Sequence, residues 1–261
     1  MAEEFVEHFS TLADGIGGTA IERKSIEDFR DHPCVQRIQC ENRNSTQTIE
    51  IEPATQGQVL AALDSLNINK ATGTDGIPPK ALKIGAKELS APLTTLFNSC
   101  INKNAWPSEW KCGHWAPVYK KDDRNAKENY RPITLLPCVS KVLEKLVGAQ
   151  INSGFGNRIY QNSSAYRKAH SCETTLINLV EDWRLARDQR QVVSILSTDM
   201  SKAFDSLHPP LLLSKLEAYG FQESAIQLLK RKYQVKIGRH VSSSRFVSRG
   251  CPQGSALGPL L

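Results

Sequence analysis

The sequence of 261 residues has no long apolar run and no sign of a secretory signal. None of its apolar segments approaches the roughly 20 residues that a helix needs to cross a bilayer. The N-terminus begins Met-Ala-Glu-Glu, which is acidic and lacks the apolar core of a signal peptide. These absences predict an intracellular protein that is not secreted and has no membrane partner. They do not distinguish nucleus from cytoplasm.

Cysteine, glycine and proline are too scarce to define the fold. The seven cysteines include no Cys-x-x-Cys pair, which disfavours a disulfide scaffold and a zinc ribbon. The 16 glycines and 13 prolines exclude a collagen-like or linker-type chain. The charge balance of 33 Lys and Arg against 27 Asp and Glu leaves a net charge of +6, which permits contact with nucleic acid but does not demonstrate it.

The hydrophobic pattern predicts a helix-rich chain with a few strands. Helices are expected over residues 3–12, 56–67, 80–102, 140–151, 172–187 and 209–220. Pro92 should kink or split the third of these helices, and residues 69–79 should form a loop with unusual backbone angles. A short strand is expected at 115–120, a buried strand at 191–200 and a β-hairpin at 235–250. This order of elements is typical of an α+β fold.

One acidic residue, Asp199, stands near the end of the segment expected to be a buried strand, and Phe204 and Asp205 follow it. Divalent cations such as Mg²⁺ prefer carboxylate and carbonyl oxygens, and Asp199 with the backbone carbonyl of Met200 offers both. For an isolated aspartate, the ordinary interpretation as a helix cap is the better one. The chemical interpretation therefore depends on the other segments.

Three further segments hold polar, basic or glycine residues that could contact a base or a phosphate. Residues 249–261 place Gln253 and Gly254 in a Pro- and Gly-rich loop, where bare backbone lets a flat base approach. Residues 161–176 present Tyr166, Arg167 and Lys168 before a helix that suits a phosphate or an ordinary cap by Ser171. Residues 118–136 hold five basic side chains that suit a triphosphate or a solvated loop: Lys120, Lys121, Arg124, Lys127 and Arg131.

Taken in order, these segments resemble the reverse transcriptase domain of non-LTR (LINE-like, Jockey-type) retrotransposons. The resemblance covers about residues 55–261, and six motifs in order are far more specific than any one of them. The matching tracts are NKATGTDGIPPKALK, NYRPITLLPCVSKVLEKLV, QNSSAYRKAHSCETTL, STDMSKAFDSLHPPLLLSKLEAYGF, VKIGRHVSSSRFVSRG and CPQGSALGPLL.

The resemblance implies an α+β right-hand polymerase with fingers and a partial palm and without a thumb. We expect a polar N-terminal segment or linker over 1–50, a fingers-type region with a helical N-terminal part over 51–190, and an incomplete palm over 191–261. The implied activity is RNA-directed DNA synthesis with two Mg²⁺ ions. The implied partners are an RNA template, a DNA primer and a deoxynucleoside triphosphate (dNTP).

The resemblance also implies a role for each site residue. Asp199 is the first metal-binding carboxylate, with the carbonyl of Met200 beside it, and Phe204 screens the 2′-position of the sugar. Lys120 and Arg131 hold the incoming triphosphate. The remaining assignments place Arg167 near the template or a phosphate, put Gln253 and Gly254 against the template–nucleotide pair, and leave Asp205 structural.

The chain departs from the family in one respect that bears on activity. The family carries a second palm motif with two adjacent aspartates, whereas the one Asp-Asp pair here, Asp122-Asp123, belongs to the basic segment. A single carboxylate cannot hold two Mg²⁺ ions in the required geometry. We therefore expect a truncated relic or a partial gene model that is inactive alone. The alternatives are a non-catalytic nucleic-acid-binding module and a scaffold without a nucleic-acid role.

Overall fold

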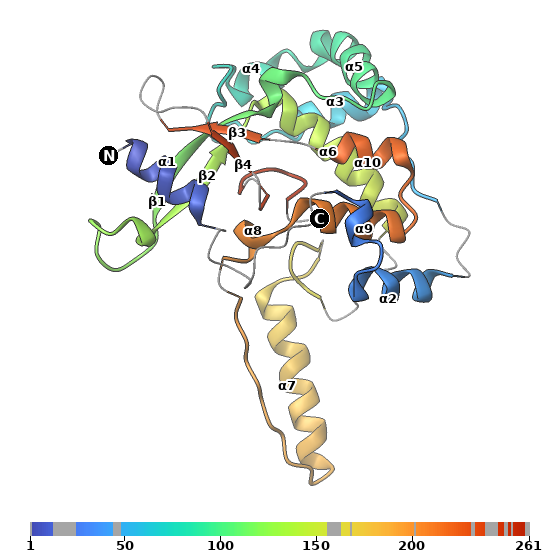
Figure 1. Cartoon of the computed structure of the whole chain (residues 1–261), viewed down its shortest axis with the longest axis vertical. Coiled ribbons are helices and arrows are strands. Elements are labelled where there is room, and N and C mark those ends of the chain that lie inside the picture. Colours follow the sequence, from blue (N-terminus) through green and yellow to red (C-terminus); the bar gives the residue numbers. More distant parts are fainter. Residues whose placement is uncertain are drawn as a thin grey trace.

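A computed structural model of the chain places its elements in the α+β class that their order predicts (Figure 1). The structure describes residues 2–12, 25–43, 48–155, 163–167, 169–200, 202–230, 233–237, 245–247, 250–251 and 253–258. Among these residues, no helix combines the length and the apolar character needed to cross a bilayer.

One mixed sheet of four strands, in the order β2-β1-β3-β4, supports the functional region. The first two strands, β1 (Cys112–Tyr119) and β2 (Tyr130–Leu135), form an antiparallel hairpin, and short 3₁₀ turns, η2 (Ser108–Lys111) and η3 (Lys127–Asn129), precede each strand. β3 (Tyr233–Lys236) pairs in parallel with β1, and β4 (Arg245–Val247) pairs antiparallel with β3. The hairpin expected at 235–250 is confirmed by this pairing, and residues 238–244 of its turn lie outside the described residues.

Six helices enclose the larger core. They are α3 (Gln56–Asp64), α4 (Pro79–Ile84), α5 (Ala86–Asn102), α6 (Cys138–Phe155), α9 (Pro209–Ala218) and α10 (Glu223–Leu229). Helices were expected at 56–67, 140–151 and 209–220, and α3, α6 and α9 confirm them. Each turns its apolar side chains inward, and the side chains of Leu63, Leu143 and Val147 are fully buried. Burial of these helical faces is the main favourable contribution to this part of the fold.

The break in the helical tract at 80–102 is not where the sequence suggested. Pro92 was expected to kink or split the tract, and the split is wrong, because α4 ends before Gly85 and α5 runs through Pro92 without a stop. Pro92 removes one backbone hydrogen bond within α5. Burial of Phe97, Cys100 and Ile101 on the inner side of the same helix offsets that loss.

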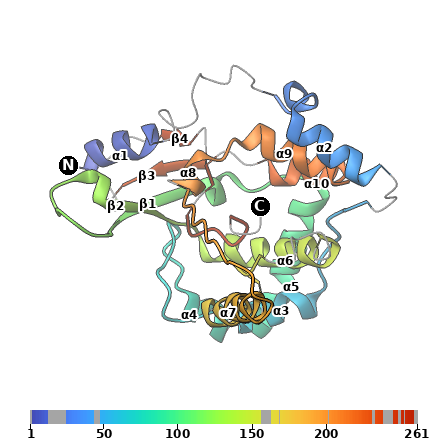
Figure 2. The ribbon, with the colours of Figure 1, turned by 90° about the horizontal axis from the view of Figure 1, so that it is seen from below.

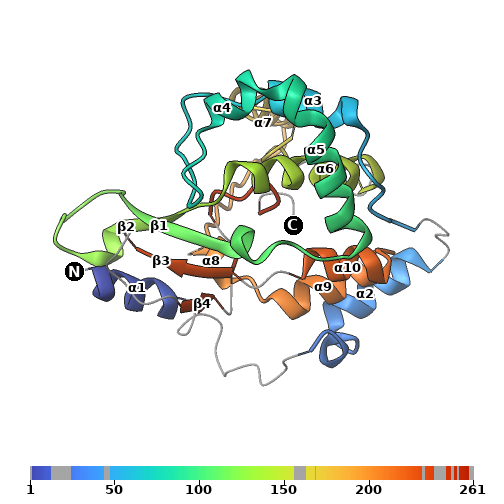
Figure 3. The same cartoon turned by 90° about the horizontal axis from the view of Figure 1, so that it is seen from above.

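The N-terminal residues form two helices, one beside the sheet and one beside α9. α1 (Ala2–Thr11) packs on one face of the sheet, where Phe9 stacks edge-on against Trp115 with ring centroids 5.6 Å apart. Figures 2 and 3 show α1 on one side of the sheet and α6 on the other. α2 (Pro33–Asn42) lies beside α9.

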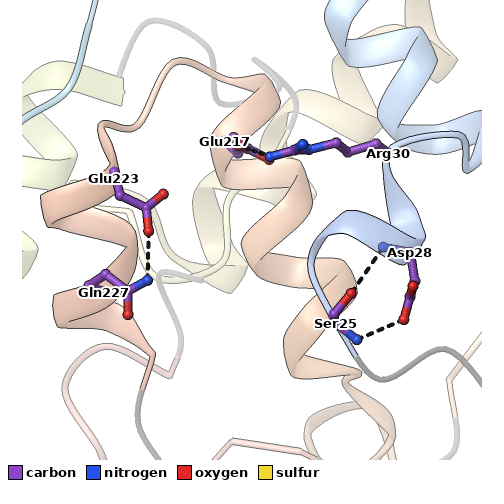
Figure 4. A network of polar contacts seen from close by, with 6 residues as sticks. All are labelled: Ser25, Asp28, Arg30, Glu217, Glu223 and Gln227. Atoms are coloured by element: carbon purple, nitrogen blue, oxygen red, sulfur yellow. Dashed lines mark hydrogen bonds and ion pairs between the residues drawn. The ribbon is translucent and has the colours of Figure 1, made fainter.

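An ion pair next to α2 fastens the N-terminal region to α9. Arg30, which follows the short η1 helix (Glu27–Phe29), donates to the carboxylate of Glu217 at 2.9 Å (Figure 4). Ser25 and Asp28 exchange hydrogen bonds that fix the start of η1. Because both partners of the ion pair are partly exposed, it contributes orientation more than stability.

The largest difference from the sequence-based expectation is the segment 191–200. It was expected to be a buried strand, and this is wrong: the segment forms no regular structure, and Val192 and Leu196 are 97% and 90% exposed. It runs back along α7 (Cys172–Asp188), which extends away from the rest of the molecule (Figure 1). An apolar strand needs a neighbouring strand and a packed face, and no described segment supplies either here.

The loop at 69–79 touches the junction between β2 and α6. Gly76 has a φ of +73°, which confirms the expected unusual backbone. At Gly73 an added Cβ would lie 2.5 Å from the carbonyl oxygen of Leu136 and 2.5 Å from Cα of Pro137. The chain therefore needs a glycine at position 73, because a side chain there would push the loop off the junction.

We expect Gly73→Ala to lower the free energy of unfolding by about 1–3 kcal/mol, the usual cost of overpacking against rigid backbone. Urea unfolding followed by tryptophan fluorescence would measure it. The matched control is Gly57→Ala in α3, where the new methyl meets nothing closer than 4.0 Å. That variant should gain about 0.4–1 kcal/mol through reduced entropy of the unfolded chain. Equal stability of the two variants would contradict the packing described for Gly73.

Candidate active site

The loop at residues 250–258 is bound to the short helix α8 (Ala203–Ser206) by backbone hydrogen bonds. The N–H of Cys251 donates to the carbonyl of Phe204 at 3.0 Å, and the N–H of Gly250 donates to the carbonyl of Leu207 at 2.6 Å. Gly250 has a φ of +79°, and an added Cβ would lie 2.8 Å from the Phe204 oxygen. The approach is so close that position 250 accepts only glycine.

The side chain of Gln253 makes a second connection between the loop and α8. Its amide nitrogen lies 3.1 and 3.2 Å from the two carboxylate oxygens of Asp205 and donates to them. Gln253, which was assigned to the template–nucleotide pair, is thus held by the residue that was expected to be structural.

The same loop also meets strand β2. The N–H of Thr134 donates to the backbone carbonyl of Gln253 at 2.6 Å. Gly254 has a φ of +112°, and an added Cβ there would lie 2.7 Å from the carbonyl oxygen of Thr134. The loop therefore joins two segments that are far apart in the sequence, the end of β2 and helix α8.

A buried carboxylate on α6 holds the far part of the loop. Glu144 has no exposed surface, and its Oε2 accepts the N–H of Ala256 at 2.6 Å. The sequence analysis missed Glu144. Helical phase offers a signal, because Glu144 shares one side of α6 with Ser140, Val147 and Ile151, all of which are buried.

The basic pair lies on the same face of the β1–β2 hairpin as this loop. Arg131 is paired opposite Val118, and the N–H of Lys120 donates to the carbonyl of Asn129 at 2.7 Å. Since residues two apart share a face, Lys120 and Arg131 point to one side of the hairpin together with Ile133. An added Cβ on Gly254 would lie 3.8 Å from Ile133, whereas α1 covers the opposite face.

Tyr166 and Arg167, the candidates from the segment before α7, make different contacts: Tyr166 contacts α8, and Arg167 bonds within its own loop. Tyr166 packs edge-on against Phe204 with centroids 6.4 Å apart. Arg167 donates to the carbonyl of Ser163 at 2.9 Å, within its own loop. Ser171 caps α7 by accepting the N–H of Thr174 at 3.2 Å, as the ordinary interpretation of this segment expected. Lys168 lies outside the described residues.

Asp199 and Met200 lie on the exposed segment that leads to α8, outside the sheet. Within the described part of the chain, Asp199 makes no hydrogen bond or ion pair, and no ion pair joins it to Lys120 or Arg131. Nor do three or more His, Cys, Asp or Glu side chains gather there as metal ligands. The described arrangement does not fit a site for two Mg²⁺ ions, which needs several carboxylates on one point.

Burial sets the electrostatics around α8 and the loop. It raises the pKa of Asp205 above its ordinary value of 3.8, against the opposing effect of the hydrogen bond from Gln253. Burial, together with the nearby Asp205, raises the pKa of the Cys251 thiol to about 11. Asp205 is therefore a desolvated group engaged with Gln253 rather than an open carboxylate.

Comparison with known proteins agrees with this chain of motifs. Residues 118–261 match the family described as reverse transcriptase (RNA-dependent DNA polymerase). Two relatives from Drosophila melanogaster are a probable RNA-directed DNA polymerase from transposon BS, 27% identical over 82% of this chain, and one from transposon X-element, 30% identical over 80%. The RNA-directed DNA polymerase from mobile element jockey of Drosophila funebris is 26% identical over 80%.

The chain spans 24% of the length of each of these three relatives. The family match covers more than half of the chain and includes the end of β1, all of β2 and α8, and the loop at 250–258 that joins β2 to α8. The chain belongs to the reverse transcriptase (RNA-dependent DNA polymerase) family, in the branch carried by non-LTR, Jockey-type retrotransposons.

Proposed function

We propose that this chain is the fingers and the beginning of the palm of an RNA-directed DNA polymerase, with residues 51–190 as fingers and 191–261 as palm. An RNA template, a DNA primer and a dNTP are its partners. The observation that carries the proposal is the meeting of β2, α8 and the loop 250–258 through Thr134, Asp205 and Gln253. These are the three segments in which the family motifs assign nucleotide contacts.

The proposed roles follow from charge and position. Phosphoryl transfer asks a protein mainly to position its reactants and to neutralise charge. Lys120 and Arg131 are exposed cations on the face that Gly254 approaches, which supports their assignment to the triphosphate. Gln253 and Gly254 form the contact surface for the base pair. Phe204 screens the sugar, and Arg167 lies toward the template.

The metal chemistry is where the chain departs from the family. Asp199 and the carbonyl of Met200 are the candidate ligands, and a bound divalent cation supplies charge neutralisation at the phosphates. Since the described residues hold no cluster of three or more side chains that could bind a metal ion, we propose that the 261-residue chain is inactive alone. No disulfide joins the seven cysteines, all of which lie in the described residues, and this supports the proposal that the protein acts inside the cell.

We expect the purified chain to extend no DNA primer on an RNA template in the presence of Mg²⁺, because one carboxylate does not hold two cations. Extension would be followed with a labelled primer on a denaturing gel. Asp199→Ala is the matched control. Template-dependent synthesis well above the level of that variant would contradict the proposed inactivity.

The chain should nevertheless bind an RNA–DNA hybrid through the basic face of the hairpin. We expect Lys120→Ala and Arg131→Ala each to weaken binding and to reduce the slope of log affinity against log salt by about 1. Fluorescence anisotropy across a series of salt concentrations would measure this.

The control for hybrid binding is Arg37→Ala on α2, an exposed arginine already paired with Glu41. It should leave the salt slope almost unchanged. If the wild type does not bind the hybrid at low salt, the assignment of this face to nucleic acid is wrong.

The raised pKa of Asp205 predicts a pH-dependent effect on stability. A raised folded-state pKa means that the group stabilises the fold below its ordinary pKa of 3.8 and loses that contribution as the pH rises. Asp205→Asn keeps an acceptor for Gln253 without a charge, so it should melt at a higher temperature than the wild type at pH 7. The difference should shrink as the pH falls toward 4.

Thermal unfolding followed by circular dichroism at pH 4 and pH 7 would measure the effect of Asp205→Asn. Asp205→Ala is the control, since it leaves the Gln253 amide without its acceptor and gains less. An Asn variant that is less stable at pH 7 than at pH 4, relative to the wild type, would show that the buried charge is favourable.

A further inference from the structure

We propose that Glu144 is a positioning residue for this site: from the core of α6 it holds the loop 253–258 in the conformation that presents Gln253 and Gly254. The inference rests on the proposed function for what the loop contacts. It rests on the structure alone for how the loop is held. Glu144 does not act on a substrate, since its effect passes through the backbone of the loop.

The first step concerns free energy: burying the carboxylate of Glu144 is unfavourable, and its hydrogen bond to the loop offsets that cost. The side chain of Glu144 on α6 is fully buried, as are those of Leu143 and Val147 on the same helix. A carboxylate in such a place is unfavourable unless it is hydrogen-bonded. The bond from the N–H of Ala256 is 2.6 Å long, and a charged acceptor makes such a bond about twice as strong as a neutral one.

The second step is that holding Ala256 orders the whole loop. The hydroxyl oxygen of Ser255 accepts the N–H groups of Leu257 at 3.1 Å and Gly258 at 3.0 Å. Leu257 is buried in the helical core. The segment from Ser255 to Gly258 is therefore a closed turn, anchored by one apolar side chain and by Glu144.

The third step is that the turn determines the position of Gln253. The backbone carbonyl of Gln253 is bound to Thr134 of β2, and its side chain is bound to Asp205 of α8. Only Gly254 separates Gln253 from the turn that Glu144 anchors. Without Glu144, the loop keeps its bonds to β2 and α8 and the apolar anchor of Leu257 but loses the hydrogen bond that fixes the backbone of Ala256, so Gln253 and Gly254 gain freedom to move away from the hairpin face.

Two variants of the full 261-residue chain test this inference by amide hydrogen exchange. Glu144→Leu removes the acceptor while it keeps a buried side chain of similar size, and Glu144→Gln keeps an uncharged acceptor. The control is Val147→Ala, a buried change on the same side of α6 at a side chain that accepts no hydrogen bond from the loop. Exchange in peptides covering residues 250–258 would be read by mass spectrometry and compared at equal global stability.

We expect the loop amides to exchange about tenfold faster or more in Glu144→Leu, the effect of losing a hydrogen bond to a charged group, with Glu144→Gln in between. Val147→Ala should change the loop no more than the rest of the molecule. Loop exchange equal to the wild type in either Glu144 variant would overturn the inference. If Glu144→Leu does not fold, Glu144→Gln alone decides.

A second readout separates positioning from general stability. We expect Glu144→Gln to weaken binding of an RNA–DNA hybrid in the wild-type background and to have a smaller effect in the Gln253→Ala background, where only Gly254 remains to be positioned. Val147→Ala should leave affinity unchanged. Equal losses in both backgrounds would overturn the inference. If the wild type binds no hybrid, the proposed function fails, and the exchange experiment still decides whether Glu144 holds the loop.

Discussion

The hydrogen bonds that join residues 250–258 to their surroundings are the constraint on which the candidate site depends. The loop is attached to β2 through Thr134, to α8 through Phe204 and Asp205, and to α6 through Glu144. Each attachment is short, and glycines bring the backbones close enough to make two of them. The loop therefore holds β2, α6 and α8, which come from separate parts of the sequence, as one unit, although the loop itself has no regular secondary structure.

Two carboxylates in this unit, the fully buried Glu144 and the half-buried Asp205, both hold the loop. Asp205 accepts from the side chain of Gln253, and Glu144 accepts from the backbone of the loop. The hydrogen bonds offset the cost of removing these carboxylates from water, and they tie both groups to the loop. The acidic residue that the family motif assigns to metal, Asp199, lies instead on an exposed segment. The architecture thus separates the groups that build the site from the group assigned to its chemistry.

Much of the local structure could be predicted because it depends on neighbours in the sequence. Helical spacing predicted α3, α6 and α9, and the short strand at 115–120 and the later hairpin were also expected, whereas β2 was not. The split at Gly85 rather than at Pro92 could not be predicted, since it depends on which side of α5 is buried. The segment 191–200 was misassigned because a strand-like composition forms a strand only when a neighbouring strand pairs with it.

The sequence by itself determined the family, the α+β class and the list of candidate residues, because motif order and residue type are local properties. Only the tertiary structure decided how those residues meet. It paired Gln253 with Asp205, placed Lys120 and Arg131 on the face that Gly254 approaches, and revealed the buried Glu144. These contacts join distant segments: Gln253 and Asp205 are 48 residues apart, and Ala256 and Glu144 are 112 residues apart. They arise from the packing of whole elements, which no local pattern encodes.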